Sequence, residues 1–263
     1  MRDHADFSTR HQRNSGCLPS RTEQWIGHLA RLPLSCRSRR TTLTGDAPTT
    51  QRLRGGIQMN PFENRDWFEG ELFDGLSLDS FNLGNREFHK CVFRNCKFPE
   101  TRWSRTRLDE CVFEGCDLTR ADPTTLSLRD VAFKSCKLMG IDFSNVGSHP
   151  HVSFEDCNLR YVSFVSVGLR KTPFKRCVIT EANFFEADLA EANFDACQFA
   201  DTRFEGCDLR KARFRAAQGL FIDPSRNRVK DTRVPLETAI LLATSLGMRV
   251  LGFTAPAEDE TPG

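Results

Sequence analysis

Cysteines are the residues of this chain with the widest chemistry, because thiolates bind metals and form disulfides. The chain has eleven, and nine of them recur at multiples of five residues, apart from one inserted residue: Cys91, Cys96, Cys111, Cys116, Cys136, Cys157, Cys177, Cys197 and Cys207. No histidines accompany them, and a CxxxxC pattern repeated every twenty residues is not zinc-ligand spacing. We interpret these cysteines as small packing residues, with metal or redox chemistry as the alternative.

Histidines offer a second candidate site in the segment SNVGSHPHVS (144–153), where His149 and His151 form a His-x-His pair. Two ligands without a third make a weak metal site, so a bulge or loop is the preferred interpretation. No GxSxG, P-loop, HExxH or dinucleotide motif occurs, and the single Tyr161 has no base and orienting partner near it in sequence. We therefore expect no catalytic residues, no metal and no cofactor, with an active site assembled between distant segments as the alternative.

The elements that must position these residues follow a period of five. Every fifth residue from Phe68 to Phe143 is large and apolar except Pro123, and the count resumes without exception from Phe154 to Phe214. The residue two places earlier is nearly always small or apolar, as at Cys91, Ala121 and Val162. Neither the helical period nor the strand period fits this pattern. A fixed short repeat over about 150 residues predicts a solenoid.

A stronger repeat of twenty residues means that four five-residue sides make one coil, and coils should stack roughly 4.8 Å apart. One inserted residue must then be absorbed in the third interval, between the repeats that begin at Val131 and Val152, which are 21 residues apart. This register stacks Phe93, Phe113, Phe133 and their successors, with Trp103, Phe143, Phe164 and Phe184 on the opposite side. It also predicts a column of alternating charge, because opposite charges on adjacent rungs attract. The column contains Arg94, Glu114, Lys134, Glu155, Lys175, Asp195 and Arg215.

Phrases such as ADLAEANFDA (187–196) and CDLRKARF (207–214) resemble the pentapeptide-repeat family of bacterial proteins, whose consensus is A(D/N)LXX. The resemblance covers roughly residues 68–219, the span of the five-residue period itself. It implies an all-β fold, a right-handed quadrilateral β-helix, which we place at residues 59–219. Interior cysteines that stay reduced suggest the cytoplasm, and no segment has the length of a membrane span.

Segments outside the repeat have other compositions. Residues 1–58 carry ten arginines and four acidic residues. We expect this Arg/Ser-rich segment to be disordered, the alternatives being a nucleic-acid-binding arm, a transit peptide, or a protein that starts at Met59. Residues 220–253 should form a connector, a helix and a short strand over 248–253. Residues 254–263 should be a disordered tail.

The segment PLETAILLATSLG (235–247) predicts an α-helix, with Pro235 at the first helical position and Gly247 as its stop. This helix can cover the last open rung of the solenoid, which would otherwise invite edge pairing. It is also the candidate dimerisation helix. Its candidate contact residues are Leu236, Ile240, Leu241, Ala243 and Leu246.

Charge is concentrated in one stretch, residues 181–208, where eight acidic residues oppose only Arg203. They are Glu181, Glu186, Asp188, Glu191, Asp195, Asp201, Glu205 and Asp208. A solvated face of the β-helix is one interpretation. The other is an acidic patch that binds a basic partner surface.

The C-terminal half, in the segments 157–177 and 218–253, resembles the microcin-immunity and quinolone-resistance members of the family. That resemblance implies a homodimer that imitates DNA, binds DNA gyrase or topoisomerase IV, and protects it from a toxin or a quinolone. The repeat departs from those members in its basic zone at 86–107 and its lack of long projecting loops. A general protein-interaction scaffold is the alternative. We expect neither direct nucleic-acid binding by the repeat nor a membrane partner.

Overall fold

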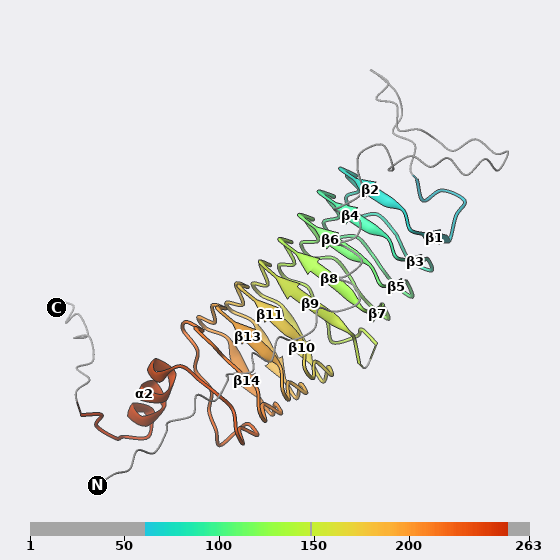
Figure 1. Cartoon of the computed structure of the whole chain (residues 1–263). Coiled ribbons are helices and arrows are strands. Elements are labelled where there is room, and N and C mark those ends of the chain that lie inside the picture. Colours follow the sequence, from blue (N-terminus) through green and yellow to red (C-terminus); the bar gives the residue numbers. More distant parts are fainter. Residues whose placement is uncertain (1–60, 148, 252–263) are drawn as a thin grey trace, which may run out of the picture. The chain divides into compact units, whose positions relative to one another are not determined.

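A computed structural model describes residues 61–147 and 149–251 of the chain (Figure 1). Residues 1–60, Ser148 and 252–263 lie outside this part, and so do the expected N-terminal and C-terminal disordered segments. The described part contains these short strands and one helix: β1 Trp67–Glu69, β2 Leu72–Asp74, β3 Glu87–His89, β4 Val92–Arg94, β5 Arg107–Asp109, β6 Val112–Glu114, β7 Ser127–Arg129, β8 Val131–Lys134, β9 Val152–Glu155, β10 Ser163–Val165, β11 Pro173–Lys175, β12 Asn183–Phe185, β13 Asn193–Asp195, β14 Arg203–Glu205 and α2 Leu236–Ser245.

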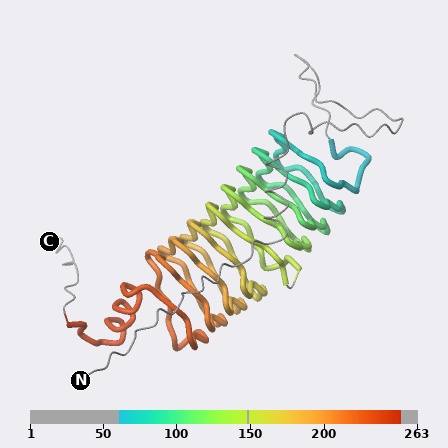
Figure 2. The backbone as a smooth tube through the Cα atoms, in the orientation of Figure 1, coloured from blue at the N-terminus to red at the C-terminus, as the bar shows by residue number. Residues whose placement is uncertain are grey.

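The strands belong to stacked coils, and every strand pairs in parallel with its equivalent one coil away (Figure 2). We number the four sides in chain order. Side 1 carries the sheet β1-β3-β5-β7, side 2 the seven-stranded sheet from β2 to β13, and side 4 the sheet β10-β12-β14. Side 3 is linked by isolated bridges such as Lys97 to Asp117. The quadrilateral β-helix predicted from the sequence is therefore confirmed.

Aromatic rings fill the interior as columns. On side 2, the ring centroids of Phe93 and Phe113 are 4.5 Å apart and those of Phe113 and Phe133 are 5.1 Å apart, both stacked. On side 4, Phe143 stacks on Phe164 at 4.9 Å. These rings are buried. The predicted vertical neighbours are confirmed, and each coil depends on the next to cover its rings.

The inserted residue lies in the third interval, as predicted. Val131 pairs with Val152, which is 21 residues away instead of 20, and the same shift separates Asp142 from Ser163. The extra residue therefore lies between Asp142 and Val152. The alternating charge column is also confirmed, because Arg94 pairs with Glu114 at 3.1 Å and Arg215 with Asp195 at 2.9 Å.

The cysteines occupy interior corners of the coils. Nine are buried and free of disulfides, and six form one continuous column: Cys96, Cys116, Cys136, Cys157, Cys177 and Cys197. The Sγ of Cys116 donates to the carbonyl of Phe93 in the coil below, at 3.3 Å. Burial raises the pKa of the Cys111 and Cys207 thiols, because desolvation disfavours the thiolate. The side chains thus fill small interior positions and satisfy a backbone acceptor.

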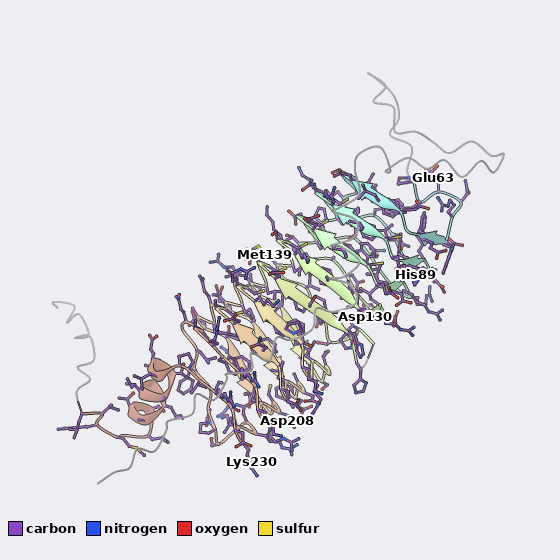
Figure 3. All side chains as sticks on the ribbon, in the orientation of Figure 1. Glu63, His89, Asp130, Met139, Asp208 and Lys230 are labelled. Atoms are coloured by element: carbon purple, nitrogen blue, oxygen red, sulfur yellow. The ribbon has the colours of Figure 1, made fainter. Side chains whose placement is uncertain are left out.

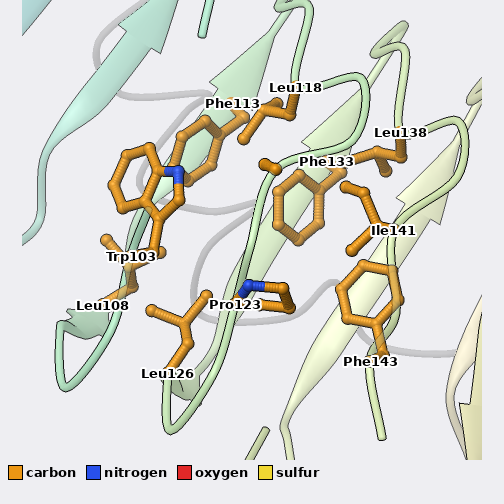
Figure 4. A pocket seen from close by; sticks show the side chains of 11 residues that line it. Trp103, Leu108, Phe113, Leu118, Pro123, Leu126, Phe133, Leu138, Ile141 and Phe143 are labelled. Atoms are coloured by element: carbon orange, nitrogen blue, oxygen red, sulfur yellow. The ribbon is translucent and has the colours of Figure 1, made fainter. Parts of the chain in front are cut away.

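Side 4 has a packing defect at Pro123. A cavity of about 20 Å³ lies beside this residue, among Trp103, Phe133 and Phe143 (Figure 4). Proline also cannot donate to the neighbouring coil. In the adjacent coils the equivalent amides do donate, Trp103 to the carbonyl of Asp122 and Phe143 to that of Ser163.

The stacked coils continue beyond the predicted end of the repeat at residue 219. Asp208 forms a parallel bridge with Arg228, and Arg213 with Arg233. The sequence signal fades because a polar residue takes an interior corner. Asn227 replaces the cysteine there, accepts the amide of Cys207 at 3.0 Å and donates to the carbonyl of Phe204 at 2.8 Å. The segment predicted as a connector is therefore largely another coil.

Helix α2 confirms the predicted helix, with one difference at its start. Pro235 is the N-cap instead of the first helical residue. Gly247 ends the helix as predicted, with φ of 78°. Its amide donates to Thr244 at 2.9 Å and that of Met248 to Ala243 at 3.0 Å, which is a Schellman motif. Residues 248–251 are not a strand, contrary to prediction, and the rest of that segment lies outside the described residues.

Candidate partner-binding surfaces

Four of the eight candidate acids gather around side 4. Glu205 lies on β14, beside Phe185 of β12. Glu181 and Asp201 occupy the same corner of successive coils, just before β12 and β14, and Glu186 directly follows β12. We call this surface the acidic face, defined by Glu181, Phe185, Glu186, Asp201 and Glu205.

The acidic face includes an aromatic side chain, because Phe185 lies beside Glu205 and is 37% exposed. Tyr161, which is 52% exposed, precedes Glu181 in the same corner column. A hydrogen bond to the Glu181 carboxylate raises the pKa of Tyr161 above its usual value. Ser166 donates to Glu186 at 3.3 Å. Exposed rings among carboxylates can bind a partner surface that is both apolar and basic.

The other four acids lie on different sides, because 28 residues wind through more than one coil. Asp188 and Asp208 are on side 1, Glu191 is at the corner between sides 1 and 2, and Asp195 is on side 2.

Most of these acids have basic partners. Asp208 contacts Arg228 at 3.3 Å and Arg210, whose guanidinium lowers the pKa of Asp208. Glu191 pairs with Arg170, and Asp195 with Arg215. On the acidic face, Glu205 also has a partner, Arg226, at 3.2 Å. The structure thus does not bring the eight acids together into one surface.

A basic segment directly follows the acidic one and was not among the predicted sites. Residues 208–233 contain eight basic and three acidic residues. Several of the bases neutralise acids of the preceding coil, as the pairs above show. Counting charge per twenty-residue coil would have shown this segment.

Helix α2 presents apolar side chains to solvent. Leu236 is 77% exposed and Leu246 is 62% exposed. Leu236, Ile240 and Ala243 recur at helical spacing and so share one side of the helix. Leu241 is 42% exposed but lies roughly 140° around the helix from Leu236. The predicted contact residues therefore form one stripe without Leu241, and Thr238 is the buried residue of α2.

Within residues 61–147 and 149–251, no three His, Cys, Asp or Glu side chains are grouped to hold a metal ion. His151 lies 3.8 Å from Asp130, as an exposed pair. No helix of this part is long and apolar enough to cross a membrane.

Comparison with known proteins matches the chain to a family model described as the pentapeptide repeat region, at residues 86–149 and 148–218, which is more than half of the chain. A trypsin-treated variant of QnrB1, a plasmid-mediated fluoroquinolone resistance protein, has 18% identity and a TM-score of 0.47 over 72% of this chain and 100% of that one. HetL, a pentapeptide-repeat protein involved in regulating heterocyst differentiation in Nostoc sp. strain PCC 7120, has 18% identity and a TM-score of 0.34 over 65% and 90%. Comparison with curated proteins gave no significant match.

Proposed function

The chain belongs to the pentapeptide-repeat family, and we propose that it is a non-catalytic β-helix that binds DNA gyrase or topoisomerase IV. The resemblance of residues 157–177 and 218–253 to the microcin-immunity and quinolone-resistance members supports this partner. In this proposal the protein works in the cytoplasm and protects the enzyme from a toxin or a quinolone.

The acidic face is the observation that carries the proposal. It places carboxylates on successive coils, at a rung spacing of roughly 4.8 Å, along one surface. A channel that holds DNA is lined with basic side chains, which a row of carboxylates attracts as phosphates do. Phe185 adds an apolar anchor of the kind that contributes most to protein interfaces.

We include the dimer in the proposal, with α2 as the interface. The exposed Leu236 and the half-buried Ile240 and Ala243 form a stripe that a second copy of α2 can cover, and the exposed Leu246 extends it. Exposed apolar stripes of this kind mark interaction sites. The acidic faces of the two copies would then belong to one dimer that binds the enzyme.

A supercoiling assay tests the proposal. Purified gyrase is titrated with the full chain, with and without a quinolone or a microcin, and we expect relief of inhibition at micromolar protein. A triple variant, Glu181→Gln, Glu186→Gln and Asp201→Asn, should need at least tenfold more protein. A matched control, Glu63→Gln, Glu69→Gln and Asp79→Asn, removes the same charge from the other end of the stack and should behave as the unmodified chain.

The alternative function, a scaffold for an unrelated partner, is favoured by the ion pairs that neutralise Glu191, Asp195 and Asp208. They leave only the acidic face to imitate DNA. An assay in which neither gyrase nor topoisomerase IV responds to the protein would leave this alternative standing.

A further inference from the structure

Within residues 208–233, at the end of the stack, side 2 places two like charges on adjacent rungs. In the column from Arg94 to Arg215, every base is adjacent to an acid on the next coil. One column away, Arg213 and Arg233 form a parallel β-bridge, so their side chains lie on adjacent rungs. Like charges on adjacent rungs repel. Neither guanidinium forms an ion pair with an acidic side chain.

Two lysines lie near this pair, at the corner between sides 1 and 2 and next to it. The amide of Lys211 donates to the carbonyl of Lys230 at 3.0 Å, so the two lysines lie on neighbouring rungs, although the residues at the same corner as Lys211 one coil before and one coil after are Glu191 and Asp231. Neither ammonium group has an acidic partner within ion-pair distance. Lys211, Arg213, Lys230 and Arg233 thus form one cluster of cations without an ion pair, which we call the basic collar.

A cleft opens beside the basic collar on side 1. Its volume is about 320 Å³, and Lys211, Lys230, Arg170 and Arg210 line it. Figure 3 labels Lys230 at the end of the stack that is followed by α2. The cleft exists because Ala190 occupies the position that Arg170 and Arg210 hold one coil before and one coil after. Its two acidic residues are Glu191, which Arg170 and Lys171 neutralise, and Asp231.

Repulsion between Arg213 and Arg233 is a cost that a structural role does not explain, because an acid at either rung would stabilise the coil. Such a departure from a local rule is typical of a binding site for the opposite charge. Duplex nucleic acid carries one charge per roughly 1.7 Å of its axis, whereas an extended acidic peptide carries at most one per roughly 3.3 Å. Four cations on two adjacent rungs match the denser polyanion better.

We infer that the basic collar binds the phosphodiester backbone of a nucleic acid duplex, independently of its sequence. The inference departs from the expectation that the repeat makes no direct contact with nucleic acid. It does not depend on the proposed binding of gyrase, and either can fail while the other stands.

The test is fluorescence anisotropy of a labelled 20-base-pair duplex titrated with the full chain between 50 and 200 mM salt. A collar variant carries Lys211→Gln, Arg213→Gln, Lys230→Gln and Arg233→Gln. We expect its affinity at 50 mM salt to be at least tenfold lower. Its plot of log affinity against log salt should be shallower by about 2 to 4, since each lost phosphate contact removes about 0.9 from the slope.

A matched variant removes four exposed or half-buried cations that are dispersed over the opposite end of the stack: Lys90→Gln, Lys97→Gln, Arg102→Gln and Arg105→Gln. Its affinity and slope should be those of the unmodified chain. Residues 1–58 are the same in all three proteins, so their ten arginines contribute equally.

Equal losses in the collar and matched variants, or no loss in either, would overturn the inference. Polyglutamate that displaces the duplex at equal charge concentration would also overturn it, by assigning the collar to an acidic protein segment. Circular dichroism melting of each variant confirms that the fold is intact.

Discussion

At the scale of single residues, Pro123 shows how strongly each interior position depends on its neighbours. It lies between Trp103 and Phe143 in the side 4 column but supplies neither a large side chain nor an amide hydrogen. The cavity beside it and the missing hydrogen bond both arise because this position is a proline (Figure 4).

Pro123→Leu should therefore stabilise the protein by about 1 kcal/mol, because leucine fills part of the cavity and donates to the next coil. Thermal unfolding measures this as a rise in Tm. Pro173→Leu is the matched control, since this residue is only half-buried and its replacement restores an amide without filling a cavity. A lower Tm for Pro123→Leu would show that the column is already fully packed.

Buried thiols make stability depend on pH. The raised pKa values of Cys111 and Cys207 mean that, above about pH 8.5, the unfolded chain loses these protons while the folded chain keeps them. The free energy of unfolding should then fall as pH rises, by up to about 1.4 kcal/mol per pH unit for each such thiol. Below that pH the two thiols contribute no dependence.

Urea unfolding between pH 7 and 10 under reducing conditions measures this effect. The double variant Cys111→Ala and Cys207→Ala should give a shallower fall, although its stability at pH 7 will be lower because a buried sulfur is lost. A slope identical to that of the unmodified chain would mean that these thiols ionise in the folded state.

At the scale of elements, the charge column of side 2 stabilises the order in which strands stack. Glu155 of β9 lies between Lys134 of β8 and Lys175 of β11. It also contacts Arg176 at 2.7 Å. The extra residue between β8 and β9 is what brings Glu155 opposite Lys134.

Glu155→Lys places three lysines on consecutive rungs and should lower the free energy of unfolding by about 1 to 2 kcal/mol. Glu155→Gln, which removes attraction without adding repulsion, should lose less than half of that. Chemical denaturation at 20 mM and 500 mM salt tests whether charge causes the loss, because screening at high salt should reduce the difference in stability between the two variants. A salt-independent loss would point to packing instead of charge.

The apolar stripe of α2 predicts the effect of charge on assembly. Leu236→Glu should convert a dimer into a monomer, because it places a carboxylate in the apolar stripe of the proposed interface, at its N-terminal end, without disturbing the isolated chain, where Leu236 is exposed. Light scattering measures the mass. Ser245→Glu, a control at the opposite side of the helix, should leave the dimer intact, and equal masses for both variants would remove α2 from the interface.

At the scale of the whole molecule, periodicity predicted the β-helix because inward positions tolerate only certain sizes. Phe93, Phe113 and Phe133 could be placed above one another from spacing alone. The end of the stack could not be placed, since Asn227 satisfies an interior corner through hydrogen bonds that no hydrophobic pattern records.

The candidate site was predictable only in part. Neighbours in a list of acidic residues are not neighbours in space, because five residues turn the chain onto the next side. Glu181 and Asp201 share a corner, whereas Asp195, between them in sequence, lies on side 2 beside Arg215. The neutralising arginines come from the next coil, so only the register reveals which acids keep their charge.

Direct binding to purified gyrase tests the proposed function most sharply. With the full chain immobilised, surface plasmon resonance should show saturable binding of gyrase or topoisomerase IV at micromolar concentration or below. The triple variant of the acidic face should bind at least tenfold more weakly, and the matched acidic control should bind normally. Absence of binding to both enzymes at about ten times that concentration, or equal binding by all three proteins, would contradict the account.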